Sequence, residues 1–263
     1  MIKIISVEEI LDLIKDFREG NKGHKIESNF YGFNSSTEQV ILLSNEYGVF
    51  FIEEDSENDV FSYFYVSLAN ALESVSFDFL MECVIKSEYI FNDLPSDFIL
   101  KHYSNLGFEH YAELKKMSRF SSQELFDVDS RIKLCGLPDF KYLRNMFNDN
   151  FDKVSERIPS DVEVYAAIAE ASIYKFLDKG KVLGFYWADT KRFVSELRYL
   201  FVSEDARGQS IGGKLLQHHL DMAKTTKKNQ LWVLSTNRPA IYLYEKYGYI
   251  FENQQDYIFR KSA

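Results

Sequence analysis

Cysteine is scarce in this chain of 263 residues, which contains only Cys83 and Cys135. The two lie far apart in the sequence, and neither has a second cysteine or a histidine at the spacing of a metal site. This excludes a disulfide framework and a zinc cluster, so we expect no bound metal. Both thiols are expected to be buried as small hydrophobic groups.

Long apolar runs are also absent, since no segment approaches the roughly 20 residues that a membrane-spanning helix needs. Residues 1–9 acquire acidic side chains too early for a secretory signal. We therefore expect a cytoplasmic protein without a membrane partner.

Positive charge is in deficit, with 31 Lys and Arg against 40 Asp and Glu, a net charge of −9 and a pI near 5.2. This argues against a nucleic-acid partner, because binding phosphates requires clustered cations. Cationic or amine-bearing partners are favoured, although solubility alone also explains an acidic protein. The hydrophobic fraction of 46% is ample for buried cores and indicates a globular protein.

The chain length suggests two domains. Residues 120–129 lose clean hydrophobic periodicity and gain Ser and Asp, as is typical of a linker. We therefore predict an N-terminal domain over residues 1–125 and a C-terminal domain over residues 126–263.

The first domain is predicted to contain one helix before a β-hairpin and another after a third apolar run. The ranges are a helix at 7–17, strands at 48–53 and 60–66 around a polar turn, an apolar run at 79–85, and a helix at 98–105 that Gly107 ends.

The second domain is predicted to alternate strands and helices. The strands are expected at 131–135, 173–177, 182–188, 196–202, 231–234 and 257–260, and the helices at 139–147, 161–172, 211–224 and 239–247. Helices that follow a meander of strands indicate a mixed α/β (α+β) domain.

A faint internal repeat links the two domains. Residues 95–119 and 239–260 each begin with proline and a helix, place a tyrosine four residues before a glycine, and have an arginine twelve residues after it. Two copies of one fold would explain this repeat, and so would chance similarity between short segments.

The most informative segment is 196–216, where a predicted strand turns into a helix through glycine and other small residues. Such a turn directs free backbone N–H groups and the positive end of the helix dipole to one place. A phosphate-bearing ligand is therefore expected there. The residues predicted to hold it are Arg207, Gly208, Gln209, Ser210, Ile211, Gly212 and Gly213.

A nucleotide-binding P-loop is one interpretation of this segment, since residues 208–214 satisfy its first seven positions. However, Leu215 stands where the magnesium-binding Ser or Thr belongs. The strand at 231–234 also continues into Ser-Thr-Asn and supplies no Asp for a second magnesium contact. Metal-assisted phosphoryl transfer therefore lacks its ligands.

The run from Arg207 to Gly212 better resembles the cofactor motif of the GNAT superfamily of N-acetyltransferases, Gln/Arg-x-x-Gly-x-Gly/Ala. Downstream, Asn237 and the run from Ala240 through Tyr244 to Gly248 resemble a second motif, Asn followed by Ala-x-x-x-Tyr-x-x-x-Gly-Phe. The resemblance covers residues 131–261. It implies a GNAT-like mixed sheet, splayed at its centre and flanked by helices. With the faint repeat, it leads us to expect two tandem domains of related fold, of which the first is a degenerate copy without a cofactor loop.

Ser210 departs from the family pattern, which usually has glycine at this position. Serine often begins a helix, so we expect it to fit without strain. The expected consequence is a looser approach of the backbone to the cofactor, and thus a lower affinity.

The resemblance implies an N-acyltransferase with acetyl-CoA as cosubstrate, in which an amine attacks the thioester directly. Glu196 resembles the family's base, and Tyr244 resembles the tyrosine that protonates the departing sulfur. Glu196 could instead be a solvated carboxylate, and Tyr244 a core aromatic residue.

The resemblance also implies that the backbone of Leu200, Phe201 and Val202 binds the pantetheine arm and polarises the thioester carbonyl. Asn237 resembles a cofactor contact, with loop capping as its alternative use. The acceptor is expected to be a small-molecule or peptide amine of unspecified identity. A CoA-binding regulatory module with decayed catalysis remains the alternative function.

Overall fold

The computed structural model describes residues 3–30, 38–55, 60–68, 83–90, 97–122 and 126–261. Its contacts divide the chain into two compact units. Unit 1 comprises Met1–Glu113, Lys153–Arg157 and Asn253–Ala263, and unit 2 comprises Leu114–Asp152 and Ile158–Glu252. The domain boundary at residue 125 stays a prediction. None of the described helices is long and apolar enough to cross a membrane.

Unit 1 is built on a sheet with the strand order β1-β3-β4-β5-β6-β13, and β2 pairs with β5. Its elements are β1 (Lys3–Ser6), α1 (Val7–Gly20), β2 (Ile26–Ser28), β3 (Gln39–Leu42), β4 (Gly48–Asp55), β5 (Val60–Leu68), β6 (Cys83–Ile90), α2 (Asp97–Asn105), the start of β7 (Glu109–Phe120) and most of β13 (Ile250–Lys261).

The predicted helix at 7–17 is confirmed and continues to Gly20. It begins where it does because Ser6 and Glu9 form a capping box, in which each side chain accepts a hydrogen bond from the other residue's backbone N–H. The predicted hairpin is confirmed by antiparallel pairing of β4 and β5. Part of its turn, and residues 79–82 of the third apolar run, lie outside the described residues.

Unit 2 has the strand order β8-β9-β10-β11-β12-β7. Its elements are β8 (Ile132–Leu134), η2 (Leu137–Asp139), α3 (Phe140–Asn150), α4 (Asp161–Ala169), β9 (Ile173–Asp178), β10 (Lys181–Lys191), β11 (Val194–Val202), η3 (Glu204–Ala206), α5 (Ile211–Met222), β12 (Lys228–Leu234), α6 (Arg238–Lys246) and the larger part of β7. All helices and strands predicted for residues 126–263 are present, but β12 and β13 begin earlier than predicted and α4 ends earlier, at Ala169.

Both units repeat one topology. In the order of each sheet, the first four strands pair antiparallel with their neighbours, the fourth and fifth pair parallel, and the fifth and sixth pair antiparallel. The parallel pairs are β5 with β6 in unit 1 and β11 with β12 in unit 2. The predicted tandem of related folds is thereby confirmed by strand order, which is far more specific than the short sequence repeat.

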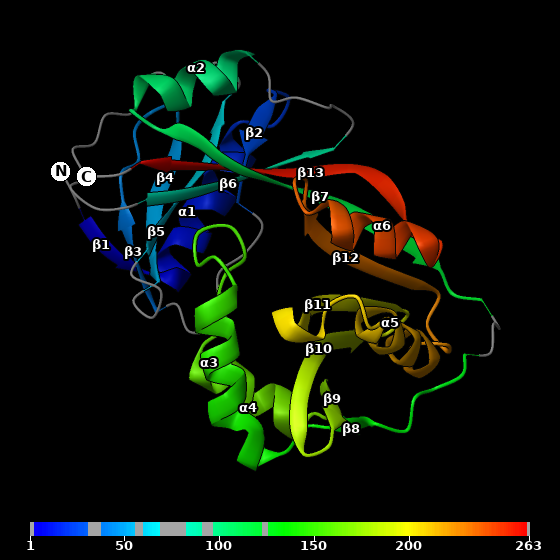
Figure 1. Ribbon diagram of the computed structural model, residues 1–263. Helices are drawn as coiled ribbons and strands as arrows, with labels where there is room; N and C mark the ends of the chain where they lie inside the picture. The colour runs from blue at the N-terminus through cyan, green and yellow to red at the C-terminus, as the bar shows by residue number, and fades with distance from the viewer. Residues whose placement is uncertain are drawn as a thin grey trace. The chain divides into compact units, whose positions relative to one another are not determined.

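The sheet of unit 2 is splayed at its centre, as predicted. Val194–Leu197 of β11 pair with Lys228–Leu231 of β12, and no pairing between these two strands follows beyond that point. On its other side β11 pairs with β10 along its whole length. The last residues of β11 therefore present one backbone edge that β12 does not occupy (Figure 1).

Each face of β10 and β11 has its own core. On one face, Leu215 and Leu216 of α5 pack with Tyr186 and Leu197. On the other, residues of α3 and α4 pack with Phe185, Trp187, Tyr199 and Phe201. The pairing shifts by one residue at Arg198, which forms a bulge between the partners of Trp187 and Ala188. Cys135 is buried, as predicted, and burial raises the pKa of its thiol to about 12.

Gly184 allows β10 and β11 to approach closely. It lies opposite Val202, and a Cβ atom placed on it would be 2.5 Å from the carbonyl oxygen of Phe201. We expect Gly184→Ala to lower the free energy of unfolding by about 2 kcal/mol, because backbone must move to make room. Urea denaturation measures this. Gly136→Ala is the control, because its Cβ would meet only Pro138 at 3.6 Å, and an equal loss in both variants would contradict the explanation.

Candidate active site

The N-terminus of α5 presents free hydrogen-bond donors. The first hydrogen bond of the helix runs from the N–H of Lys214 to the carbonyl of Ser210, at 3.1 Å. The backbone N–H groups from Ser210 to Gly213 have no acceptor in the part of the chain that the structure describes. Donors grouped at the positive end of a helix dipole form an anion-binding site. The predicted phosphate loop thus has the required backbone geometry.

Two glycines keep the start of α5 close to its neighbours. A Cβ atom on Gly212 would lie 3.4 Å from Leu243 and 3.7 Å from Val202. One on Gly213 would lie 3.0 Å from the hydroxyl of Tyr247. A Cβ atom on Gly213 would therefore require Tyr247 to shift, whereas one on Gly212 would make ordinary contacts and only a larger side chain would clash there.

Ser210 does not act as an ordinary helix cap, so that expectation was wrong. Its backbone is left-handed, with φ 60° and ψ 15°, and its side chain makes no capping hydrogen bond. Glycine adopts this conformation without the Cβ clash that other residues suffer. The position therefore favours glycine for its backbone angle, as does Gly208 with φ +78°.

Because Ser210 and Gly208 both have a left-handed backbone, introducing glycine at the first and removing it at the second should change the stability in opposite directions. We expect Ser210→Gly to raise the free energy of unfolding by about 0.5 kcal/mol, since relief of strain exceeds the added freedom of the unfolded chain. Gly208→Ala should lower it by about 1 kcal/mol. Urea denaturation of both variants is the measurement, and changes of the same sign would refute this interpretation.

Arg207 and Gln209 lie on the solvent side of the loop. The side chain of Arg207 is 61% exposed, and its guanidinium pairs with Glu204 at 3.3 Å and donates to the carbonyl of Val202 at 3.4 Å. Gln209 donates to the carbonyl of Asp205 at 3.3 Å. A surface pair of this kind contributes little stability. The Arg207 side chain can therefore exchange Glu204 for a ligand phosphate at small cost.

Asn237 caps α6, which is the alternative use predicted for it. Its Oδ1 accepts a hydrogen bond from the N–H of Ala240 at 3.2 Å. The residue is exposed, and its side-chain amide N–H groups make no hydrogen bond to a described residue. Capping therefore leaves these donors available to a ligand.

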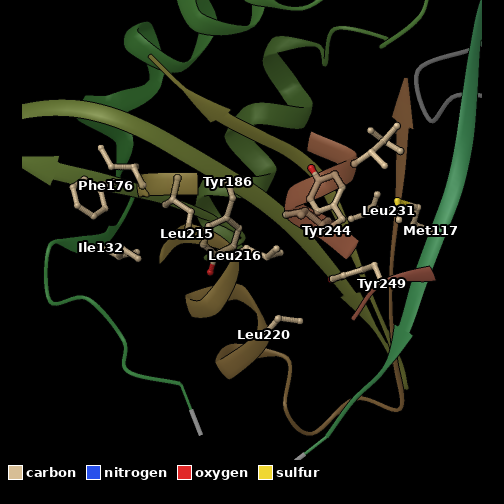
Figure 2. Close-up of a cluster of buried hydrophobic side chains, with 14 of the residues drawn as sticks. Met117, Ile132, Phe176, Tyr186, Leu215, Leu216, Leu220, Leu231, Tyr244 and Tyr249 are labelled. Carbon is tan, nitrogen blue, oxygen red and sulfur yellow. The ribbon is translucent and has the colours of Figure 1, made fainter. Parts of the chain in front are cut away.

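Tyr244 lies near the end of α6 with only 7% of its surface exposed. It belongs to the hydrophobic cluster of unit 2, where its ring centre is 5.8 Å from that of Tyr249 (Figure 2). Tyr249 has a buried hydroxyl without a partner among the described residues, and burial raises its pKa above the usual value. Tyr244 is thus a core residue, whatever its chemical role.

Glu196 is positioned immediately before the point where β11 and β12 separate. It is half-buried, and its carboxylate accepts a hydrogen bond from Gln230 of β12 at 3.2 Å. It is therefore held in place by the neighbouring strand, unlike a freely solvated carboxylate. Leu200, Phe201 and Val202 follow on the unpaired edge.

Arg119 is a supporting residue that the sequence did not identify as part of the site. It lies on β7, and its guanidinium donates to the carbonyl of Tyr247 at 2.6 Å, just beyond the end of α6. A cation at a helix C-terminus stabilises the helix dipole. The only sequence signal was its place in the faint repeat, twelve residues after Gly107.

Comparison with known proteins agrees with this geometry. Residues 140–249 match the model of the acetyltransferase (GNAT) family. YjbC of Bacillus subtilis (strain 168), whose name assigns it provisionally to the acetyltransferases, is 39% identical over 87 residues. That match covers 30% of this chain and 41% of YjbC, so the chain spans less than half of its relative's length.

Solved structures extend the fold likeness over nearly the whole chain. A tandem GNAT protein from the clavulanic acid biosynthesis pathway is 9% identical, covers 99% of this chain and 98% of its own, and gives a TM-score of 0.56. A GCN5-related N-acetyltransferase from Sphaerobacter thermophilus is 11% identical, with coverage of 95% and 84% and a TM-score of 0.59. At these identities the likeness concerns the fold alone. The family match identifies residues 140–249 as a domain of the acetyltransferase (GNAT) family.

Proposed function

We propose that unit 2 transfers an acetyl group from acetyl-CoA to the nitrogen of an amine. One observation carries the proposal: the free N–H groups of α5 follow directly after the strand edge that β12 leaves open. A pyrophosphate bound at the helix and a pantetheine arm running along residues 200–202 would use these two features in sequence. The thioester would then lie near Glu196.

The side chains support direct transfer. Glu196 takes a proton from the acceptor ammonium, directly or through water, which frees the nitrogen lone pair. The nitrogen forms a bond to the thioester carbon, and the carbon–sulfur bond breaks. Tyr244 donates its proton to the leaving sulfur, since a phenol with a pKa of about 10 can protonate a thiolate whose conjugate acid has a pKa of about 8.5. Solvent then returns a proton to Tyr244, removes one from Glu196, and takes the second proton from the nitrogen, which leaves a neutral amide and releases one net proton.

A CoA-binding regulatory module is the second candidate. The burial of Tyr244 favours it, because a phenol that is 7% exposed has little access to a sulfur atom. The strained Ser210 points in the same direction, since it departs from the backbone chemistry that favours glycine.

Calorimetric titration with acetyl-CoA, and separately with ATP and magnesium, tests the proposal. Acetyl-CoA binding, together with CoA release in the presence of an amine, would support acetyl transfer. Binding without release by any amine would favour the regulatory module, and binding of ATP alone would refute both.

Arg207→Ala should weaken the binding of acetyl-CoA by about tenfold, because a charged hydrogen bond to phosphate contributes roughly 1.5 kcal/mol or more. Folding should be unaffected, since the side chain is exposed and its pair with Glu204 is weak. Lys181→Ala is the control, since it also removes one exposed cation paired with a carboxylate, that of Asp205. Unchanged affinity in Arg207→Ala would remove this residue from the cofactor site.

A further inference from the structure

Unit 2 contains a cleft of about 540 Å³ at the opposite end of α5 from the free N–H groups. The last residues of α4 and α5 form two of its walls. The third wall is the end of β10. Pairing between β9 and β10 stops at Ile173 with Trp187, and β10 continues beyond that point. None of the motif residues from Arg207 to Gly213 lines it. The cleft is thus a feature separate from the anion-binding loop.

The charges around the cleft favour a cation. Its ionisable lining comprises the carboxylates of Glu163, Glu170 and Asp189 and the cations Lys191 and Arg198. The guanidinium of Arg198 forms ion pairs with Asp189 at 3.4 Å and with Glu163 at 3.9 Å. Two carboxylates therefore surround one guanidinium, while Glu170 makes no ion pair with any residue that the structure describes. The negative ends of the α4 and α5 dipoles add to this potential.

Aromatic side chains reinforce the preference for a cation. Tyr174 and Tyr186 line the cleft with stacked rings whose centres are 5.3 Å apart. Trp187 lines it as well, and the guanidinium of Arg198 lies 4.5 Å from its ring centre. Organic cations bind favourably over such rings. Tyr174 is half-buried, so its ring adds an aromatic surface for an ammonium group, whereas Tyr186 and Trp187 are 1% and 2% exposed.

A buried histidine adds a demand for a hydrogen-bond partner. Thr190 donates to the hydroxyl of Ser195 at 3.2 Å, and that hydroxyl also hydrogen-bonds to Nε2 of His219, 3.0 Å away. Burial lowers the pKa of His219 to about 3, so the ring is neutral at physiological pH, with one nitrogen as donor and the other as acceptor.

Nδ1 of His219 is buried and has no hydrogen-bond partner among the described residues. An unpaired buried polar atom is destabilising by roughly 1–3 kcal/mol, so a partner supplied by a ligand would stabilise the complex. His219 lines the cleft.

We propose that the cleft binds a small primary amine that also carries a hydroxyl group, with the ammonium facing Glu170 and Asp189 and the hydroxyl forming a hydrogen bond with Nδ1 of His219. The inference depends on the cleft alone and would stand if acetyl transfer failed its own test.

Three probes of equal size separate the two requirements: aminopropanol has both groups, butylamine has only the ammonium, and propanediol has only hydroxyls. Each is titrated into ¹⁵N-labelled full-length protein and followed by amide chemical shifts. We expect aminopropanol to shift Ala171, Ser172, Ala188 and Thr190 saturably, butylamine to bind about tenfold more weakly, and propanediol not to bind. Equal binding of propanediol, shifts confined to residues 208–213, or no binding of any probe would overturn the proposal.

A charge-matched pair of variants locates the ammonium. Glu170 is exposed, so the Glu170→Gln variant should fold normally and should bind both amines about tenfold more weakly. Asp149→Asn removes the same charge from α3, outside the cleft, and should change neither affinity. An unchanged affinity in Glu170→Gln, or an equal loss in Asp149→Asn, would contradict the assignment.

Once binding is established, a transfer assay distinguishes two roles for the bound amine. If aminopropanol is acetylated when acetyl-CoA is added, the cleft holds the acceptor. If aminopropanol is unchanged but alters the rate of transfer to another amine, the cleft holds an effector. Both outcomes support an amine site, and they assign its role.

Discussion

Tyr244→Phe should lower kcat for acetyl transfer by about tenfold or more while leaving the affinity for acetyl-CoA nearly unchanged. The substitution removes only the hydroxyl to which we assign protonation of the leaving sulfur in our proposal, and general acid catalysis contributes at least this much. The ring keeps its place in the hydrophobic cluster beside Tyr249. Steady-state kinetics with calorimetric titration of acetyl-CoA separate the two effects.

Tyr242→Phe provides the matched control. It removes a phenol hydroxyl from the same helix, two residues away, but the Tyr242 side chain is 72% exposed and outside the core. We expect wild-type kcat for this variant. Wild-type kcat for Tyr244→Phe would make Tyr244 a packing residue only, while equal losses in both variants would indicate a general effect on α6.

A chain that begins at residue 126 should fail to fold cooperatively, even though it contains every residue of the family match. It lacks residues 114–120 of β7, which pair with the whole length of β12. Met117, which is fully buried in the cluster of unit 2, would be lost with them. The buried side of Leu231 and Val233 would then be exposed along an unpaired strand edge, which promotes aggregation. Solubility and urea denaturation measure the effect.

A chain that begins at residue 108 is the comparison, because it restores β7 and with it the contact from Arg119 to Tyr247. It should be more soluble than the shorter chain and should unfold more cooperatively. If the chain from residue 126 instead unfolded cooperatively and bound acetyl-CoA, the predicted boundary would mark a self-sufficient domain and β7 would be dispensable.

The active-site loop could be predicted because its information is local. A strand, an Arg-Gly turn and a helix follow one another within residues 196–216, and each has a sequence signature. The conformation of Ser210 could not be predicted, since serine is common at helix starts and nothing in its neighbours indicates a left-handed backbone.

Features that join distant segments were missed. β7 has no regular alternation of apolar residues, because Lys115 and Lys116 interrupt it, and its partner in unit 2 lies more than 100 residues further along. β1, β2 and β3 are too short to show a period. The lining of the cleft comes from α4, β9, β10, β11 and α5, so no single stretch of sequence could predict it.

The assignment of β13 to the sheet of unit 1 has a consequence for biosynthesis. Its residues 254–261 pair with β6, yet the ribosome makes them after every other described strand. The other strands of unit 1 therefore leave the ribosome first, and one edge of β6 stays unpaired until β13 is made. The sheet of unit 1 is completed only after all the strands of unit 2 have been synthesised. An exposed strand edge during that interval is a site for binding by chaperones or for pairing between nascent chains.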